Sequence, residues 1–344
     1  MHYYSLDKVI SYNVPVNIII TERGYGKSFS VKDYVIKQYK KNKSQFLYLR
    51  RYENELKSVF EHTSTKEEMN KKDFFDDLKK FYPDDKLCAK NKKFYINDEC
   101  FGFAKRMTES QDLKSATFNH VKTIIIDEYP IEKGRRYYLP NEGMIIMNIF
   151  DSIIRNRSDI KIFILGNAVE GLEYSPLFLF FDLQLPYGKK DIKLFKDNMI
   201  LLQYATNSEF RKEREQTLIG KLAKGTPYEE YAINNKILNK NNDFIEKKKG
   251  SSQFSFGFVY KNQYYGVWND FHEGKIYVSS DYDKYSPYIY ALTLEDHRPN
   301  TLLISSAKKY SHWKFLSENF KIGNVYFENQ KIKKYCTDAI KLFL

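Results

Sequence analysis

Cysteine is scarce in this 344-residue chain: Cys88, Cys100 and Cys336 are the only three, and they lie far apart. The sequence has no Cys-x-x-Cys pair and no histidine-rich cluster, which argues against a disulfide framework or a structural zinc site. No apolar run approaches the roughly 20 residues that a membrane helix requires, and the first residues lack the apolar segment of a secretion signal. We therefore expect a protein of a reducing cytoplasm that does not enter a membrane.

Basic side chains outnumber acidic ones, with 56 Lys and Arg against 44 Asp and Glu and a net charge of +12. Aromatic residues make up 17% of the chain, which argues against a disordered protein. At roughly 100–200 residues per domain, the length predicts two domains or three small ones. The positive charge fits a polyanionic partner but is a weak indication by itself.

The first part of the chain, residues 1–187, alternates short β-branched apolar runs with helical patterns. This alternation predicts a parallel α/β sheet. Between the second and third strands, an insertion contains a candidate hairpin with the turn Asn97-Asp98. The predicted strands cover residues 14–20, 46–49, 121–126 and 162–165, and the predicted helices cover residues 28–40 and 142–157.

Two further stretches differ from the first. Residues 188–249 are the most basic part of the chain per residue, and we predict a basic helical linker there; a solvated helical hairpin without a partner explains the pattern equally well. Residues 250–344 contain three short strands and then two helical patterns, which predicts an α+β domain with an antiparallel meander. The three strands cover residues 254–260, 264–268 and 275–278, and the helical patterns lie around 311–319 and 331–343.

A glycine-rich loop, Thr21-Glu22-Arg23-Gly24-Tyr25-Gly26-Lys27-Ser28, follows the first predicted strand and precedes a helix. It matches the end of the phosphate-loop pattern G-x-x-x-x-G-K-[ST], with Thr21 in place of the first glycine. In such a loop, backbone N–H groups hold phosphate oxygens, Lys27 neutralises the β- and γ-phosphates, and the Ser28 hydroxyl binds Mg²⁺. We predict that ATP is bound by Arg23, Gly24, Tyr25, Gly26, Lys27 and Ser28.

Thr21 departs from the usual pattern. Glycine is favoured where φ must be positive, so this residue predicts an altered loop shape or weaker binding. The same glycines form half of a dinucleotide-binding pattern, but Phe29 stands where the third glycine should be, and Lys27 suits a triphosphate better.

Two carboxylates end the third predicted strand, in the run Ile124-Ile125-Ile126-Asp127-Glu128. An apolar strand that delivers acidic residues is the partner that a phosphate loop requires. We predict that Asp127 holds Mg²⁺ and that Glu128 polarises the water that attacks the γ-phosphate. A solvated acidic turn is the ordinary alternative. The adjacent glutamate favours hydrolysis over transfer of the phosphate to another substrate.

Two other residues near strand ends are candidates for the same site. Asn167 follows the fourth strand and would lie beside the third if these strands are neighbours, where it would bind water or the γ-phosphate; an ordinary turn asparagine is equally consistent. Arg155 ends the helix before that strand. It either favours the helix dipole or reaches into the nucleotide site of a neighbouring subunit.

The order of several motifs resembles one family: the DNA-packaging ATPases of small protein-primed tailed phages, whose motor includes a structural packaging RNA. The motifs are Arg-Gly-Tyr-Gly-Lys-Ser at the loop, residues 47–56, Ile-Ile-Asp-Glu-Tyr, residues 139–142, Arg-Asn-Arg and residues 166–169. The similarity covers nearly the whole chain, and no single motif decides it.

The resemblance implies an ATPase domain of the additional-strand, catalytic-glutamate (ASCE) class. It implies a homopentameric ring at the portal vertex of a prohead, in the host cytoplasm, which hydrolyses ATP to move double-stranded DNA inward. Lys27, Ser28, Asp127 and Glu128 match the family's phosphate loop and acidic strand end. Arg155 matches its trans-acting arginine, and Lys114 matches a lysine suspected of acting across the subunit interface.

The C-terminal meander resembles a degenerate, vestigial form of the RNase H-like nuclease domain of large terminases. An active nuclease needs a carboxylate cluster that holds two metal ions. The first strand of the meander carries no acidic residue, and the acids elsewhere supply such a cluster only in part: Asp270, Asp281, Asp283, Glu295 and Asp296. We therefore predict no nuclease activity and a role in docking to DNA, RNA or portal.

DNA in a ring would be held through its backbone charge. Candidates are Lys133, Arg135 and Arg136, with Tyr137, in the segment just after Glu128; a solvated charged loop is equally consistent. The basic stretch 188–249 is a second candidate. The alternative functions are a large terminase with an active nuclease, a nucleic-acid-binding adaptor without ATPase activity and, less favoured, a replicative helicase.

Overall fold

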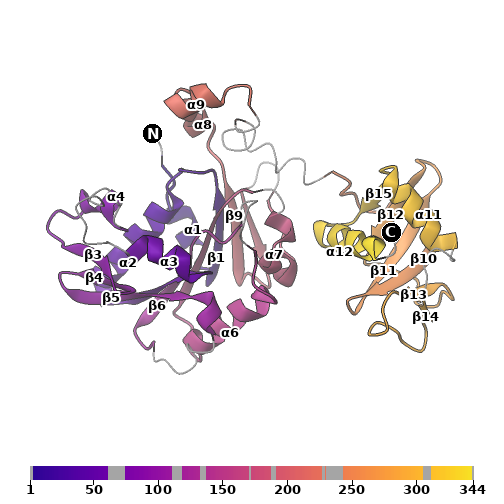
Figure 1. The fold of residues 1–344 in the computed structure, drawn as a ribbon, viewed down its shortest axis with the longest axis horizontal. Coiled ribbons are helices and arrows are strands. Elements are labelled where there is room, and N and C mark those ends of the chain that lie inside the picture. The colour runs from indigo at the N-terminus through magenta and orange to yellow at the C-terminus, as the bar shows by residue number, and fades with distance from the viewer. Residues whose placement is uncertain are drawn as a thin grey trace. The chain divides into compact units, whose positions relative to one another are not determined.

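The computed structural model describes residues 3–60, 74–110, 118–131, 137–169, 172–186, 191–226, 229, 243–304 and 311–342. The chain divides into two compact units, Met1–Leu238 and Asn239–Leu344. Each unit has its own sheet and its own hydrophobic core (Figure 1). Among the helices that the structure describes, none is long and apolar enough to cross a membrane.

The first unit is built on a nine-stranded sheet with the order β3-β4-β5-β2-β6-β7-β1-β9-β8. From β5 to β9 neighbouring strands are parallel, and the strands outside this block pair antiparallel. The strands are β1 (Val16–Thr21), β2 (Gln45–Arg50), β3 (Leu87–Lys90), β4 (Lys93–Ile96), β5 (Glu99–Arg106), β6 (Val121–Ile126), β7 (Lys161–Asn167), β8 (Ile192–Phe195) and β9 (Ile200–Ala205). Each of the four predicted strands overlaps an observed one, so the predicted parallel α/β sheet is confirmed.

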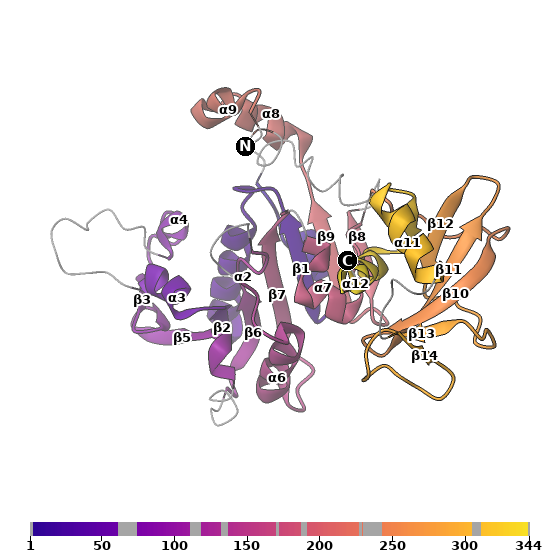
Figure 2. The same ribbon diagram turned by 45° about the vertical axis from the view of Figure 1, so that its right-hand side comes forward.

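Helices cover both faces of this sheet, as Figure 2 shows. The alternation of side chains along a strand creates two cores: Ile18 and Ile20 of β1 belong to one, and Ile19 belongs to the other. The first core includes side chains of α6 and α7, and the second includes side chains of α1 to α4. The helices are α1 (Asp7–Ser11), α2 (Lys27–Asn42), α3 (Glu53–Phe60), α4 (Asp76–Lys79), α6 (Glu142–Ile154), α7 (Pro176–Phe181), α8 (Ser208–Glu215) and α9 (Leu218–Ala223), with short 3₁₀ turns at Met107–Glu109 and Leu172–Tyr174.

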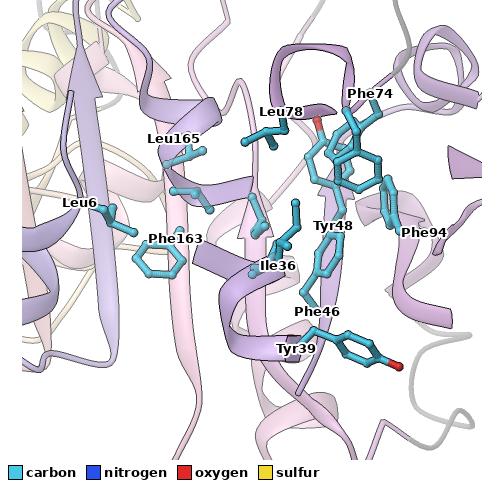
Figure 3. Close-up of a cluster of buried hydrophobic side chains, with 14 of the residues drawn as sticks. Leu6, Ile36, Tyr39, Phe46, Tyr48, Phe74, Leu78, Phe94, Phe163 and Leu165 are labelled. Atoms are coloured by element: carbon cyan, nitrogen blue, oxygen red, sulfur yellow. The ribbon is translucent and has the colours of Figure 1, made fainter. Parts of the chain in front are cut away.

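The predicted hairpin is formed by β4 and β5. Asn97 and Asp98 have φ values of 50° and 65°, which a two-residue hairpin turn of type I′ requires. Figure 3 shows how its first strand joins the second core: the ring of Phe94 packs against Phe46 at 4.9 Å and Phe74 at 4.7 Å between centroids. The hairpin thereby extends the sheet beyond β2.

The predicted start of the linker at residue 188 is wrong. Residues Ile200, Leu201 and Leu202 form a short apolar run that is buried, and β9 pairs in parallel with β1. β8 pairs with β9 and ends the sheet. Helices α8 and α9 follow, so the helical character predicted for this stretch begins only at residue 208. Residues 230–242 of the predicted linker lie outside the described residues.

The second unit contains a six-stranded sheet with the order β14-β13-β10-β11-β12-β15. β10, β11 and β12 form the predicted antiparallel meander, and β13 and β14 continue the sheet in parallel from β10, an order that fits an RNase H-like domain. Residues 243–246 also belong to this unit, because Ile245 bridges to Phe327; its predicted start at 250 is therefore too late. The elements are β10 (Gln253–Tyr260), β11 (Gln263–Asp270), β12 (Lys275–Ser279), β13 (Ile289–Ala291), β14 (Leu302–Leu303), α11 (Ser311–Lys321), β15 (Val325–Phe327) and α12 (Gln330–Lys341).

Candidate active site

The phosphate loop connects β1 to α2. Gly24 and Gly26 have φ values of 80° and 100°, so the loop uses glycine where the backbone is left-handed. Thr21 is the last residue of β1, paired with Asn167 and Ala205, and is not among the residues with positive φ. This position requires only an extended strand residue, so the reason for expecting an altered loop shape does not apply, and weaker nucleotide binding stays a prediction.

The acidic strand end lies beside this loop. β7 pairs with β1 on one side and with β6 on the other, so the predicted adjacency of the third and fourth strands is confirmed. The Ser28 hydroxyl donates to Asp127 Oδ1 at 3.3 Å, and Lys27 Nζ donates to Asn167 Oδ1 at 2.5 Å. The carboxyl ends of three neighbouring strands thus bring together the loop lysine and serine, the aspartate and the asparagine.

Glu128, the residue after Asp127, has an unusual backbone conformation. Its φ is 52°, a left-handed conformation that is uncommon outside glycine, and its N–H donates to Asp127 Oδ1 at 2.9 Å. Its side chain is 61% exposed, and Oε2 accepts from Arg50 Nη2 at 2.5 Å. The strained turn therefore directs the glutamate away from the core and toward Arg50.

Arg50 and Tyr48, both on β2, are site residues that sequence reasoning missed. The Tyr48 hydroxyl donates to Asp127 Oδ2 at 3.2 Å. Burial and the charge of Asp127 raise the pKa of Tyr48 well above its ordinary value, so it stays protonated as a donor. Arg50 is the polar residue at the carboxyl end of a strand next to β6. A polar residue at the carboxyl end of a neighbouring strand is the feature that identified Asn167, and the same feature could have identified Arg50.

Arg51 ties both ends of the segment after Glu128 to β2. Its guanidinium is buried and donates to both carboxylate oxygens of Glu142, at 2.7 and 2.8 Å, and to the Tyr129 carbonyl at 2.8 Å. Glu142 also accepts the Leu139 N–H at 2.8 Å. Two adjacent arginines thus contact the catalytic candidate and the base of the segment that contains the DNA-binding candidates.

Helix α8 packs directly on the phosphate loop. The buried Glu22 carboxylate forms an ion pair with Arg211, and Arg214 Nη1 donates to the Arg23 carbonyl at 2.7 Å. The Tyr25 ring lies 5.0 Å from that of Phe210. Burial raises the pKa of the Glu22 carboxyl, and the neighbouring guanidiniums offset only part of that shift.

Arg155 and Arg157 differ in the exposure and the hydrogen bonds of their guanidinium groups. Arg157 donates to the carbonyls of Asn119 and Val121, at 3.0 and 2.8 Å, and to those of Ile153 and Ile154, so it binds the end of α6 to the start of β6. Arg155 is exposed, and its guanidinium makes no hydrogen bond or ion pair with any residue that the structure describes. Of the two cations in the motif, Arg155 is therefore the exposed one.

Some predicted residues lie outside the described part of the chain: Lys114, Lys133, Arg135 and Arg136. Tyr137, at the edge of that segment, is 75% exposed.

Two of the five candidate acids of the second unit, Asp270 and Asp296, hold turns. Asp296 accepts from the N–H groups of Lys261 and Asn262 at 3.0 and 2.6 Å, and Asp270 accepts from those of His272 and Glu273 at 2.9 and 3.0 Å. Within the described residues, no three His, Cys, Asp or Glu side chains come together as a metal site. The absence of nuclease activity remains a prediction.

A family model described as Podovirus DNA encapsidation protein (Gp16) matches residues 1–342. The chain belongs to this family. It is 34% identical over 339 residues to the DNA packaging protein of Bacillus phage PZA, covering 98% of this chain and 97% of that protein. The predicted resemblance is thereby confirmed.

Solved structures agree with this assignment. A chain of the bacteriophage phi29 viral genome packaging motor assembly matches with a TM-score of 0.75 and 32% identity, over 99% of both chains. The N-terminal domain of the DNA packaging ATPase from phi29 matches with a TM-score of 0.50 and 33% identity, over 59% of this chain and 96% of that domain. The chain is a viral genome packaging ATPase, and the phosphate loop and acidic strand end are its candidate active site.

Proposed function

We propose that this packaging ATPase hydrolyses ATP with Mg²⁺ at the loop between β1 and α2 and uses the energy to move double-stranded DNA into a prohead. The observation that carries the proposal is the convergence of Lys27, Ser28, Asp127 and Asn167 at the ends of β1, β6 and β7. Lys27 binds the β- and γ-phosphates, and the glycine backbone leaves the loop open to them.

Ser28 and Asp127 fit a magnesium ion. Their oxygen atoms lie 3.3 Å apart at the start of α2, and hydroxyl and carboxylate oxygens are the ligands that Mg²⁺ prefers. When bound, the ion neutralises charge on the phosphate oxygens. Tyr48 orients the aspartate through its second oxygen.

Glu128 acts as the general base, and Arg50 controls it. While the carboxylate is paired with Arg50 it is held away from an attacking water, so the pair must open for hydrolysis. Arg51, which directly follows Arg50 at the end of β2, binds Glu142 and so anchors the segment that holds Lys133, Arg135 and Arg136. We propose that these three side chains contact the DNA backbone and that β2 couples their state to Glu128.

Arg155 completes the site of a neighbouring copy. Its exposure, and the absence of a partner for its guanidinium among the described residues, support a role in trans, which requires a homo-oligomer. We propose a pentameric ring that docks on the portal and packaging RNA of a prohead in the host cytoplasm, with Lys114 at the subunit interface. The similarity to a chain of the phi29 packaging motor assembly supports this proposal.

The test is ATP hydrolysis with and without long duplex DNA, measured for the wild type and for Glu128→Gln while oligomer size is followed. We expect DNA to stimulate turnover and the variant to lose roughly 100- to 10,000-fold in rate while still binding ATP. Arg155→Ala should be inactive alone and should regain part of its activity when mixed with Glu128→Gln, because each variant supplies what the other lacks.

Arg157→Ala is the structural control for Arg155, since mixing should not rescue a defect in folding. A wild type that binds no nucleotide in any oligomeric state would leave the adaptor function instead. Cutting of plasmid DNA in the presence of Mg²⁺ or Mn²⁺ would support the terminase with an active nuclease.

A further inference from the structure

The cleft at the phosphate loop extends well beyond the loop itself. Its volume is about 620 Å³, which lies within the roughly 300–1,000 Å³ that is typical of small-molecule sites. One end is formed by Gly24, Gly26, Lys27 and Ser28. The other end is formed by residues of and after α4, which belong to the segment between β2 and β3: Asp76, Asp77, Lys80 and Phe81. The cleft therefore has room for more than a triphosphate.

The two ends differ in chemistry. The loop end offers backbone N–H groups and the ammonium of Lys27, which suit phosphate. The α4 end has the carboxylates of Asp76 and Asp77 beside two ammonium groups, that of Lys80 and that of Lys79, which pairs with Asp76 at 3.0 Å, so it carries no net charge. Phosphate groups are therefore favoured at the loop end, and the uncharged part of a nucleotide is directed toward α4.

Phe81 provides an aromatic surface at that end. Its side chain is 58% exposed although it is large and apolar. The ring meets Phe29 edge to face, at 5.4 Å between centroids, and Phe29 directly follows Ser28 at the start of α2. The aromatic wall therefore runs from the phosphate cradle to Phe81, while Lys80 Nζ lies 5.0 Å from the Phe81 centroid.

We propose that Phe81 is the base-binding residue of this site: the purine ring of the nucleotide stacks on Phe81, with Phe29 supporting that ring from the side of the loop. This inference rests on the proposed binding of a nucleoside triphosphate at the phosphate loop. Stacking uses the π-face that every base has, so the contact adds affinity without distinguishing adenine from guanine. The site then takes purine nucleoside triphosphates as a class.

The experiment is calorimetric titration of the full-length protein with MgATP, MgGTP and magnesium tripolyphosphate, which has no base. For Phe81→Ala we expect roughly ten-fold weaker binding of both nucleotides and unchanged binding of tripolyphosphate. Phe81→Trp should keep nucleotide affinity, because it keeps an aromatic face. Both natural tryptophans, Trp268 and Trp313, lie in the second unit, so the new indole also gives a fluorescence signal specific to this cleft.

Two further variants serve as controls for Phe81→Ala. Phe271→Ala removes a phenylalanine of the second unit that is more exposed than Phe81, at 72%, and should change nothing. Lys27→Ala should weaken nucleotides and tripolyphosphate alike. If Phe81→Ala binds ATP as the wild type does, or loses ATP and tripolyphosphate equally, the inference is overturned while the proposed function stands. If the wild type binds neither ATP nor tripolyphosphate, the proposed function itself fails.

Discussion

The first unit keeps Glu128 at the edge of its sheet with 61% of the side chain exposed, whereas the second unit buries Asp270 and Asp296 almost completely. Glu128 comes just after β6 and Asp270 is the last residue of β11, whereas Asp296 lies in the connection between β13 and β14. Glu128 is held by one side-chain ion pair, but the two aspartates each accept backbone N–H groups of a turn. The carboxylate that we propose as the general base is therefore paired with a side chain, which can move away, whereas the two carboxylates that build turns accept from backbone groups, which are fixed.

The first unit also contains carboxylates of the second kind. Glu142 is fully buried, and its oxygens are occupied by Arg51 and by the Leu139 N–H. The contrast therefore lies in the surroundings of each carboxylate and not in the unit that contains it. The following changes test that contrast, beginning with the largest expected effect.

Glu142→Gln should destabilise the first unit by about 3–5 kcal/mol, because it leaves the guanidinium of Arg51 buried without its counter-charge. Urea unfolding followed by far-UV circular dichroism measures the loss. The double variant Arg51→Met/Glu142→Leu should recover much of it, since both charges are then gone. A fully stable Glu142→Gln protein would show that water reaches Arg51 and that the pair is not the anchor described above.

Asp296→Asn should destabilise the second unit by about 1–3 kcal/mol, because an amide cannot accept from both turn N–H groups and the Thr293 hydroxyl. Trp268 and Trp313 make fluorescence a report on this unit alone. Glu128→Gln is the matched exchange in the first unit, and urea unfolding followed by far-UV circular dichroism should be unchanged for this variant. Equal stability losses in the two variants would contradict the distinction between a reactive and a structural carboxylate.

Arg211→Gln should weaken ATP binding roughly ten-fold, because it removes the ion-pair partner of Glu22 in the phosphate loop and leaves only the charge of Arg214 to offset that carboxylate. Adding Glu22→Gln should restore most of the affinity, and the exposed Lys212→Gln on the same helix should have no effect. Calorimetric titration of the wild type, the single variants and the double variant with MgATP measures these affinities. Additive losses in the double variant would mean that α8 acts on the loop by packing alone.

His312 gives the smallest effect, a dependence of the second unit's stability on pH. Burial lowers the pKa of its imidazole below the ordinary value of 6.5, and Nδ1 lies 2.8 Å from the Tyr290 hydroxyl. The unfolded chain then takes up a proton more readily than the folded unit. The contribution of neutral His312 is therefore complete above pH 6.5 and is lost as the pH falls below it.

Tryptophan-monitored urea unfolding between pH 7.5 and 5.5 measures this effect. The wild type should lose more stability over this interval than His312→Phe, which cannot be protonated. The same slope in both proteins would assign the dependence to other groups.

The central sheet and half of the site could be predicted from the sequence, for a physical reason. β1, β6 and β7 are short β-branched runs buried on both faces, and each is followed by polar residues that must lie at one edge. That logic identified Lys27, Ser28, Asp127, Glu128 and Asn167. It failed for Arg50 only because the predicted second strand stopped one residue early.

Other parts of the site have no local signature. Glu22 and Arg211 are 189 positions apart, and nothing in the amphipathic pattern of α8 specifies that this helix packs on the loop. β9 was not predicted because its apolar run is short and lies in a strongly basic stretch, where the charge suggested a solvated helix. In both cases tertiary packing decided the outcome.

The backbone at Arg155 has a φ of 49° and a ψ of −119°, a conformation that glycine adopts far more readily than arginine. Replacing this arginine with glycine should make the isolated protein slightly more stable, not less. Selection for stability alone would therefore favour glycine over arginine at this position. If Arg155 acts on a neighbouring subunit as we propose, selection on the assembled oligomer would keep an arginine that the fold of the single subunit does not favour.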